Sequence, residues 1–265
     1  MTALKQNLDR VEAAIHAACR RAGRHRGEVE LMAVSKTYPA ATIDEAARLG
    51  LRLFGENRVQ EFAAKADDLA PWRADGAIAA SDAPILMHLI GHLQSNKAAK
   101  AVELFDAIDS VDSLRLAERL NEAAAKLHKR LPVLLEIKLS PEESKAGLEP
   151  ESLELAQLFE RLPDLHHLHL HGLMTIAPWG VSEDETRACF RSLRQLRKRW
   201  AYEHPHLKFD VLSMGMSGDF GIAIEEGATR VRIGTALFGK RPPTAAQQAA
   251  YPEDFDAEDP EDSDE

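Results

Sequence analysis

The sequence contains few cysteines and no long apolar run, and both absences restrict the kinds of protein it can encode. Cys19 and Cys189 lie far apart, in segments with helical spacing of apolar residues, which fits neither a disulfide framework nor a zinc site. No window approaches the ~20 apolar residues that a membrane-spanning helix needs, and residues 1–26 lack the apolar region of a secretory signal. We therefore expect a soluble protein in a reducing compartment, the cytoplasm.

The folded part of the chain also lacks a large net charge. The formal net charge is −10 over 265 residues, but nine acidic residues and no basic residue lie within residues 252–265. The remainder carries about −1, so no nucleic-acid surface and no strong steering field are expected. The end of the chain has too little apolar content to bury and is expected to be disordered. We divide the chain into a folded domain, residues 1–241, and an acidic tail, residues 242–265.

Short apolar runs alternate with segments of helical period along the folded domain. Eight runs are expected to be strands: residues 31–34, 51–54, 85–90, 105–111, 133–139, 168–174, 209–214 and 230–233. Alternation of this kind predicts parallel strands joined by right-handed crossovers, and eight units predict closure into a (β/α)8 barrel. An open doubly wound sheet is the alternative, but no glycine fingerprint of the dinucleotide kind follows the first strand.

The last unit of this pattern is short. Residues 235–240 leave little room for an eighth helix, so the leading helix, residues 2–22, is expected to cover that gap. We therefore expect a single α/β TIM barrel whose functional residues follow the carboxyl ends of the strands.

Lys36 lies two residues after the first predicted strand. The next helix is expected to begin with a capping box at residues 42–45 and to stop at Gly50. Lys36 then lies in a strand-to-helix loop, where α/β folds place chemistry. A solvated loop lysine is the alternative.

Small and hydroxyl residues follow the last two predicted strands. Gly215, Ser217, Gly234 and Thr235 would form a cup of backbone N–H groups of the kind that binds phosphate in barrel enzymes. The alternative is that the hydroxyls are helix caps and the glycines turn residues. A phosphate cup facing Lys36 suggests a phosphorylated aldehyde held as a Schiff base.

Arg232 lies between Val231 and Ile233 in the last predicted strand, so its side chain points opposite to theirs. If it points inward it needs an acceptor, because an unpartnered buried guanidinium is very costly. A bound pyridine nitrogen would provide one. An ion pair with a barrel acid and an outward-facing arginine are the alternatives.

Three histidines, His167, His169 and His171, alternate along the sixth predicted strand. No acidic or cysteine cluster with matching spacing follows them, so we expect no metal site. They are expected to pack between the strand and the helices or to make single hydrogen bonds. His88 and His92, which flank the third strand, are expected to be structural.

The segments at the strand ends together resemble one family. They are residues 34–37 (VSKT), 54–57 (FGEN), 90–97 (IGHLQSNK), 172–175 (GLMT), 212–217 (LSMGMS) and 231–235 (VRIGT). In this order and spacing they resemble the pyridoxal phosphate homeostasis protein family, the YggS/PROSC group, from Met1 to Arg241.

This resemblance implies a fold-type III barrel, similar to the N-terminal domain of alanine racemase, with pyridoxal 5'-phosphate (PLP), the vitamin B6 cofactor, held as a Lys36 aldimine. It implies that Arg232 faces the pyridine nitrogen. The phosphate residues it implies are Ser217, Gly234 and Thr235, and those near the ring are Asn57 and Ser213.

The resemblance also implies PLP homeostasis and delivery of the cofactor to enzymes that require it, without established catalysis and hence without a catalytic residue. An arginine at the pyridine nitrogen weakens the ring as an electron sink. A weak or narrow racemase is the alternative, and a scaffold that recruits a partner through the acidic tail is a third reading. Racemases of this type have a second domain that supplies their dimer surface, so we expect a monomer here. Lys145 is a further candidate for taking up aldehyde.

Overall fold

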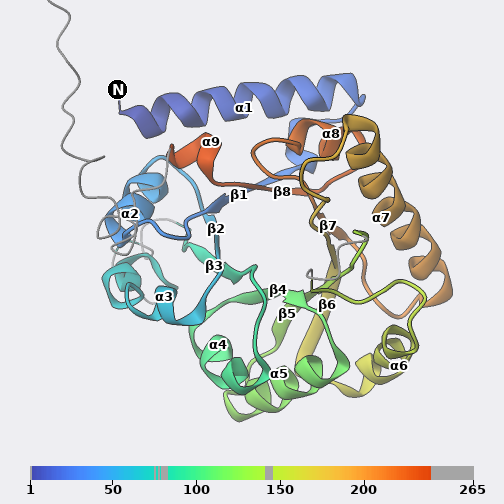
Figure 1. Ribbon diagram of the computed structural model, residues 1–265. Coiled ribbons are helices and arrows are strands. Elements are labelled where there is room, and N and C mark those ends of the chain that lie inside the picture. The colour runs from blue at the N-terminus through green and yellow to red at the C-terminus, as the bar shows by residue number, and fades with distance from the viewer. Residues whose placement is uncertain (1, 75, 77, 79–82, 141–145, 240–265) are drawn as a thin grey trace, which may run out of the picture.

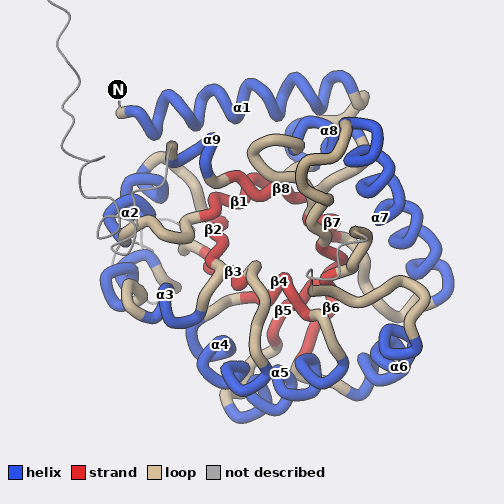
Figure 2. Tube along the Cα trace, viewed as in Figure 1, coloured by secondary structure: helices blue, strands red, loops and turns tan. Residues whose placement is uncertain are grey.

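The strands form one closed parallel barrel in the order β1-β2-β3-β4-β5-β6-β7-β8, as predicted. The structure, a computed structural model, describes residues 2–74, 76, 78, 83–140 and 146–239. Figure 2 shows the ring of strands from one end, with the helices outside it. The predicted acidic tail and Lys145 lie outside the described residues.

All eight predicted strands are present, although several are shorter than their apolar runs. They are β1 (Glu30–Val34), β2 (Leu53–Glu56), β3 (Leu86–Leu89), β4 (Ala107–Val111), β5 (Leu131–Glu136), β6 (Leu168–Met174), β7 (Val211–Ser213) and β8 (Arg230–Ile233). The fifth strand ends three residues earlier than predicted, and this moves Glu136 to the rim of the barrel.

The helices surround the barrel. They are α1 (Ala3–Arg21), α2 (Ala40–Arg48), α3 (Val59–Ala63), α4 (Ala98–Leu104), α5 (Leu114–Lys126), α6 (Leu153–Arg161), α7 (Glu183–Glu203), α8 (Phe220–Glu225) and α9 (Thr235–Phe238). Short 3-10 helices are η1 (Arg26–Glu28), η2 (Asp67–Trp72), η3 (Ser95–Lys97) and η4 (Leu162–Asp164). No helix in the described part of the chain is long and apolar enough to cross a membrane.

The leading helix α1 covers the gap left by the short α9, as predicted. It packs against both α8 and α9, and Figure 1 shows it lying across them. Its apolar face, which includes Leu8, Val11 and Ile15, is buried there. Asn7 of α1 donates a hydrogen bond to the carbonyl of Leu237 in α9 (2.9 Å). The two ends of the described chain therefore join to complete the helix layer.

Alternation along the strands divides the buried side chains into two sets. Leu31 and Ala33 of β1 belong to the large core between strands and helices, whereas Met32 and Val34 belong to a small cluster inside the barrel. A Cβ atom at Gly55 would lie 2.8 Å from the sulfur of Met32 and 2.9 Å from Ile90, so this position of β2 faces the same interior cluster. This division identifies which residues of each strand point inward.

One local prediction was wrong. The helix after β1 has Pro39 as its N-cap and begins at Ala40, so Thr42 lies in its first turn and forms no capping box. Proline fixes the backbone torsion at this entry and so starts the helix earlier. The segment after β2 forms two helices, α3 and η2. The predicted stop at Gly50 is confirmed by its positive φ of 96° directly after α2.

Candidate functional site

Lys36 lies two residues beyond β1, at the carboxyl end of the barrel. The Ser35 side chain points away from the barrel interior and donates a hydrogen bond to Glu56. Because side chains alternate along an extended chain, Lys36 lies on the interior side, as Val34 does. The Lys36 side chain is half-buried. The predicted position of this amine in a strand-to-helix loop is therefore confirmed.

A buried ion pair holds the loop that carries Lys36. The Glu56 Oε1 atom accepts a hydrogen bond from the hydroxyl of Ser35 (2.5 Å) and lies 2.8 Å from the Lys65 Nζ atom. Lys65 also donates to the backbone carbonyls of Ser35 (3.2 Å) and Tyr38 (2.8 Å). Lys65 thus fixes the backbone on both sides of Lys36.

The residue after Lys36 has an unusual backbone. Thr37 has a φ of 70°, a left-handed conformation that β-branched residues rarely adopt. Its N–H donates to the carboxylate of Glu61, which is also 3.8 Å from Lys65 Nζ. Strain of this kind persists where the surroundings fix it, and it occurs most often at functional sites.

Glu56 is fully buried, and burial raises the pKa of its carboxyl. The charge and hydrogen bond of Lys65 and the hydrogen bond of Ser35 act in the opposite direction. Among the described residues the second oxygen, Oε2, has no hydrogen-bond partner. The buried negative charge of Glu56 is therefore stabilised by the positive charge of Lys65.

Arg232 points into the barrel, so the alternative of an outward-facing arginine is wrong. Its neighbours Val231 and Ile233 pack outward, and its guanidinium donates to the Ser213 hydroxyl (2.8 Å) and to the Thr175 carbonyl (2.9 Å). Burial lowers the pKa of Arg232, and nearby carboxylates act in the opposite direction. The group stays a cationic donor, and it brings Ser213 into the same site.

The loops after β7 and β8 meet. The Ser217 hydroxyl accepts a hydrogen bond from the backbone N–H of Ala236 (3.2 Å), in the first turn of α9. Gly234 is the N-cap of α9, and Thr235 is its exposed first residue. The structure therefore brings together Ser217, Gly234 and Thr235. The N-cap of α8, the helix that follows Ser217, is Asp219, so Ser217 is not its N-cap and bonds the neighbouring loop instead.

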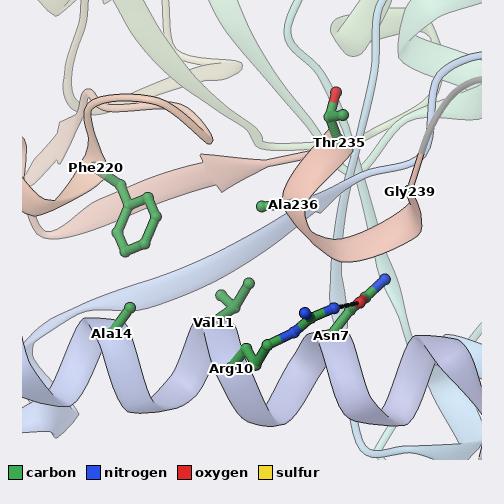
Figure 3. Close-up of a pocket in the computed structure, with 8 residues that line it drawn as sticks. All are labelled: Asn7, Arg10, Val11, Ala14, Phe220, Thr235, Ala236 and Gly239. Atoms are coloured by element: carbon green, nitrogen blue, oxygen red, sulfur yellow. Dashed lines mark hydrogen bonds between the residues drawn. The ribbon is translucent and has the colours of Figure 1, made fainter.

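A groove of about 500 Å³ lies on the outer side of the same loops, between α1 and α9. Figure 3 shows Val11 and Ala14 of α1 directed into it, whereas the Thr235 side chain is turned away from α1. The groove is therefore lined from α1, α8 and α9.

Asn57 follows β2 directly and is half-buried. Its backbone packs against Gly91, after β3, so closely that a side chain at Gly91 would collide with it. The fold thus places Asn57 at the rim, directly after Glu56, the last residue of β2.

The sequence analysis missed an ion pair inside the barrel. Arg230 donates to Asp109 Oδ2 (3.0 Å), and the other oxygen of Asp109 is 3.0 Å from Nδ1 of His88. Burial raises the pKa of Asp109, but His88 and Arg230 more than offset this and hold it below its usual range. His88 is structural, as expected. These residues come from three strands, so no local pattern identifies their contact.

Of the two alternatives predicted for the histidines of β6, the single hydrogen bonds are confirmed, whereas His169 and His171 do not pack between the strand and the helices. Leu168 and Leu170 face the helices, so His169 and His171 face the barrel interior, where His171 Nε2 lies 2.9 Å from His169 Nδ1. Burial lowers the pKa of both histidines. Among the described residues no group of three metal-ligating side chains has metal-site geometry.

A second group that the sequence analysis missed lies at the ends of β4 and β5. Glu136 is only 7% exposed, and burial and the nearby Asp112 raise its pKa to about 7. His92, predicted to be structural, has an exposed side chain whose Nδ1 lies 2.7 Å from Asp112 Oδ2. Glu136 was missed because the fifth strand was predicted to continue beyond it.

Residues 6–242 match the family described as alanine racemase, N-terminal domain, so the chain belongs to this class of TIM barrel. An alanine racemase structure from Clostridium difficile has the same fold at 15% identity, with a TM-score of 0.67 over 90% of this chain and 57% of that one. The predicted fold class is confirmed.

Two closer relatives identify the family within this class. A pyridoxal phosphate homeostasis protein from Vibrio cholerae is 42% identical over 91% of this chain and 98% of its own length. The structure of PipY from Synechococcus elongatus with PLP bound is 43% identical, with a TM-score of 0.69 over 85% of this chain and 99% of that one. The chain belongs to the pyridoxal phosphate homeostasis protein family, as the sequence motifs indicated.

Proposed function

We propose that this protein binds PLP through the Lys36 amine and takes part in PLP homeostasis and delivery. The observation that carries the proposal is that a half-buried lysine at the end of β1 and an inward-facing arginine on β8 share the barrel mouth, on paired neighbouring strands. An amine and a fixed cationic donor suit an aldehyde and a ring nitrogen, respectively. The relative PipY, 43% identical, has a structure with PLP bound.

The remaining donors fit the other parts of the cofactor. Ser217, Gly234 and Thr235 would hold the phosphate with hydroxyl and backbone N–H groups, and Asn57 and Ser213 would lie near the ring. Arg232 is already oriented by the Ser213 hydroxyl and the Thr175 carbonyl, so its planar group needs no rearrangement to donate to the ring nitrogen. PLP bound here would supply an electrophilic aldehyde carbon and an electron-withdrawing ring.

A binding role is favoured over racemisation by Arg232. An arginine donates its proton to the ring nitrogen without giving it up, which leaves the ring a weak electron sink. We propose that the protein acts as a cytoplasmic monomer, residues 1–241 forming the binding domain, that hands PLP to enzymes requiring it and has no catalytic residue of its own. A weak racemase would instead exchange the α-proton of an amino acid faster than free PLP does.

The test is absorption spectroscopy of the protein mixed with PLP, followed by borohydride reduction and peptide mapping, in wild type and Lys36→Ala. We expect a visible absorption band in wild type, a reduced adduct on Lys36, and neither in the variant. Lys100→Ala is the control, because Lys100 is an exposed lysine of α4 paired with Glu103 (2.7 Å). Absence of the band in wild type, or an adduct that persists in Lys36→Ala, would contradict the proposal.

A further inference from the structure

Three titratable side chains lie at the barrel mouth on the side opposite Lys36. We call Glu136, Asp112 and His92 the rim cluster. They follow or end β5, β4 and β3, respectively, whereas Lys36 follows β1. In the closed ring β1 and β5 are four strands apart, so Glu136 and Lys36 lie on opposite sides of the mouth.

The strand register sets two carboxyl groups of the cluster side by side. Val111 of β4 pairs with Leu135 of β5, and both side chains pack against the helix layer. The next residue on each strand, Asp112 and Glu136, therefore points inward at the same level of the barrel. The two carboxyls thus face the mouth together.

Glu136 is a largely buried acid, with only 7% of its surface exposed. Within the part of the chain that the structure describes, its side chain makes no hydrogen bond or ion pair. The charged groups that face Glu136 are Asp112, Arg232 and His92. Burial and Asp112 raise the pKa of Glu136 to about 7, whereas Arg232 and His92 act in the opposite direction. An unpaired buried carboxyl is costly, so its orientation into the mouth indicates a ligand that pairs with it.

The chemistry of the cluster favours a small cation that donates hydrogen bonds. Two carboxyl groups side by side repel each other and are stabilised by a positive charge between them. Metal-site geometry is absent from this cluster and from all other described residues. A primary ammonium group supplies one positive charge and three N–H donors, which matches two carboxyls that have free acceptor positions.

We propose that the rim cluster binds the ammonium group of an incoming primary amine, such as that of an amino acid or a lysine side chain, and that Glu136 accepts a proton from its nitrogen. This inference rests on the proposed function, because it names the acceptor for the aldehyde that Lys36 holds. The proton moves from the ammonium nitrogen to a Glu136 oxygen, and the nitrogen keeps the lone pair with which an amine attacks an aldehyde carbon. A base whose pKa lies near the working pH is suited to this transfer.

The first test uses the cofactor-free protein. Selective ¹³C labelling of glutamate carboxyls allows the titration of Glu136 to be followed by NMR, with Glu136→Gln assigning the signal. We expect methylammonium chloride to lower the pKa of Glu136 by about one unit, a tenfold change in proton affinity, and tetramethylammonium, which has no N–H donor, to leave it unchanged. Asp112→Asn should lower the pKa without added amine, because Asp112 raises it. Equal responses to the two cations would overturn the inference.

The second test uses the PLP-loaded protein and measures the release of Lys36 by methylamine. In Glu136→Gln we expect normal PLP loading but a release rate lower by about 10²-fold, without the inflection near pH 7 of wild type. The control is Glu149→Gln, the same substitution at an exposed acid that follows the same strand. Normal loading with a wild-type release rate in Glu136→Gln would overturn the inference and leave the proposed function intact. Failure of wild type to load would contradict the proposed function, whereas the methylammonium titration would still decide the inference.

Discussion

The buried pair of Lys65 and Glu56 gives the sharpest prediction for the loop that carries Lys36. Lys65→Met keeps the aliphatic stem of the side chain and removes the charge that lies 2.8 Å from the fully buried Glu56 carboxylate. It also removes the donor to the carbonyls of Ser35 and Tyr38. Breaking a buried pair in this way costs about 3–5 kcal/mol, because one charge is left without compensation.

The magnitude can be measured by urea and thermal unfolding. For a domain of this size we expect Lys65→Met to lower the melting temperature by roughly 6–20 °C, since each kcal/mol shifts it by about 2–4 °C. Because burial already raises the pKa of Glu56 above its unfolded-state value, the folded variant binds a proton more tightly than the unfolded chain does. Its stability therefore falls as the pH rises through the folded-state pKa, and part of the loss is recovered in acid.

Two further variants separate the charge effect from lost packing. Glu56→Gln combined with Lys65→Met removes both charges and should recover much of the lost stability and abolish the extra pH dependence. Lys100→Met, at an exposed lysine, should cost less than about 1 kcal/mol. The reasoning would be refuted if the free energy of unfolding of Lys65→Met at pH 7 were within about 1 kcal/mol of the wild-type value and did not change when Glu56→Gln was added.

Three other substitutions test the barrel interior by unfolding experiments. The folded-state pKa of Glu136 is raised from 4.5 to about 7. As the pH rises from 4.5 to 7, the free energy of unfolding of wild type should therefore fall by up to about 3 kcal/mol relative to that of Glu136→Gln. Equal pH dependence of stability in the two proteins would contradict this. Gly172→Ala should cost more than about 3 kcal/mol, since the new methyl would overlap a carbonyl of β7, whereas Gly27→Ala, in open space, should be tolerated. Arg230→Leu leaves Asp109 without its arginine and should lower the free energy of unfolding by about 3–5 kcal/mol. Adding Asp109→Asn to this variant should restore part of the stability, and a double variant no more stable than Arg230→Leu alone would disprove the pairing.

The strands were predictable because they depend on local periodicity, and each is a short apolar run. In β8 the alternation of Val231, Arg232 and Ile233 predicted that the arginine points opposite to its neighbours, but which of the two sides faces the helices came from the structure. Lys36 was located from its place shortly after an apolar run. A pattern with period two therefore predicts the two faces of a strand, but not which face is the interior.

The other groups depend on contacts between segments that no local pattern records. The pairing of Lys65 with Glu56 arises because the helix after β2 breaks and the chain turns beneath the Lys36 loop. Glu136 reaches the rim because β5 ends there, although the apolar residues of the run continue to Leu139. Strand ends depend on the neighbouring strands that supply hydrogen bonds, and a single run contains no information about them.

The position of α1 has a consequence for how the chain folds during synthesis. Its apolar face is covered by α8 and α9, whose residues lie about 200 positions later in the sequence. Contacts of such long sequence separation form slowly, because a long loop must close before they stabilise the protein. This early helix is therefore covered late. Its Leu8, Val11 and Ile15 stay exposed to chaperones, or to other nascent chains, until α8 and α9 have been synthesised.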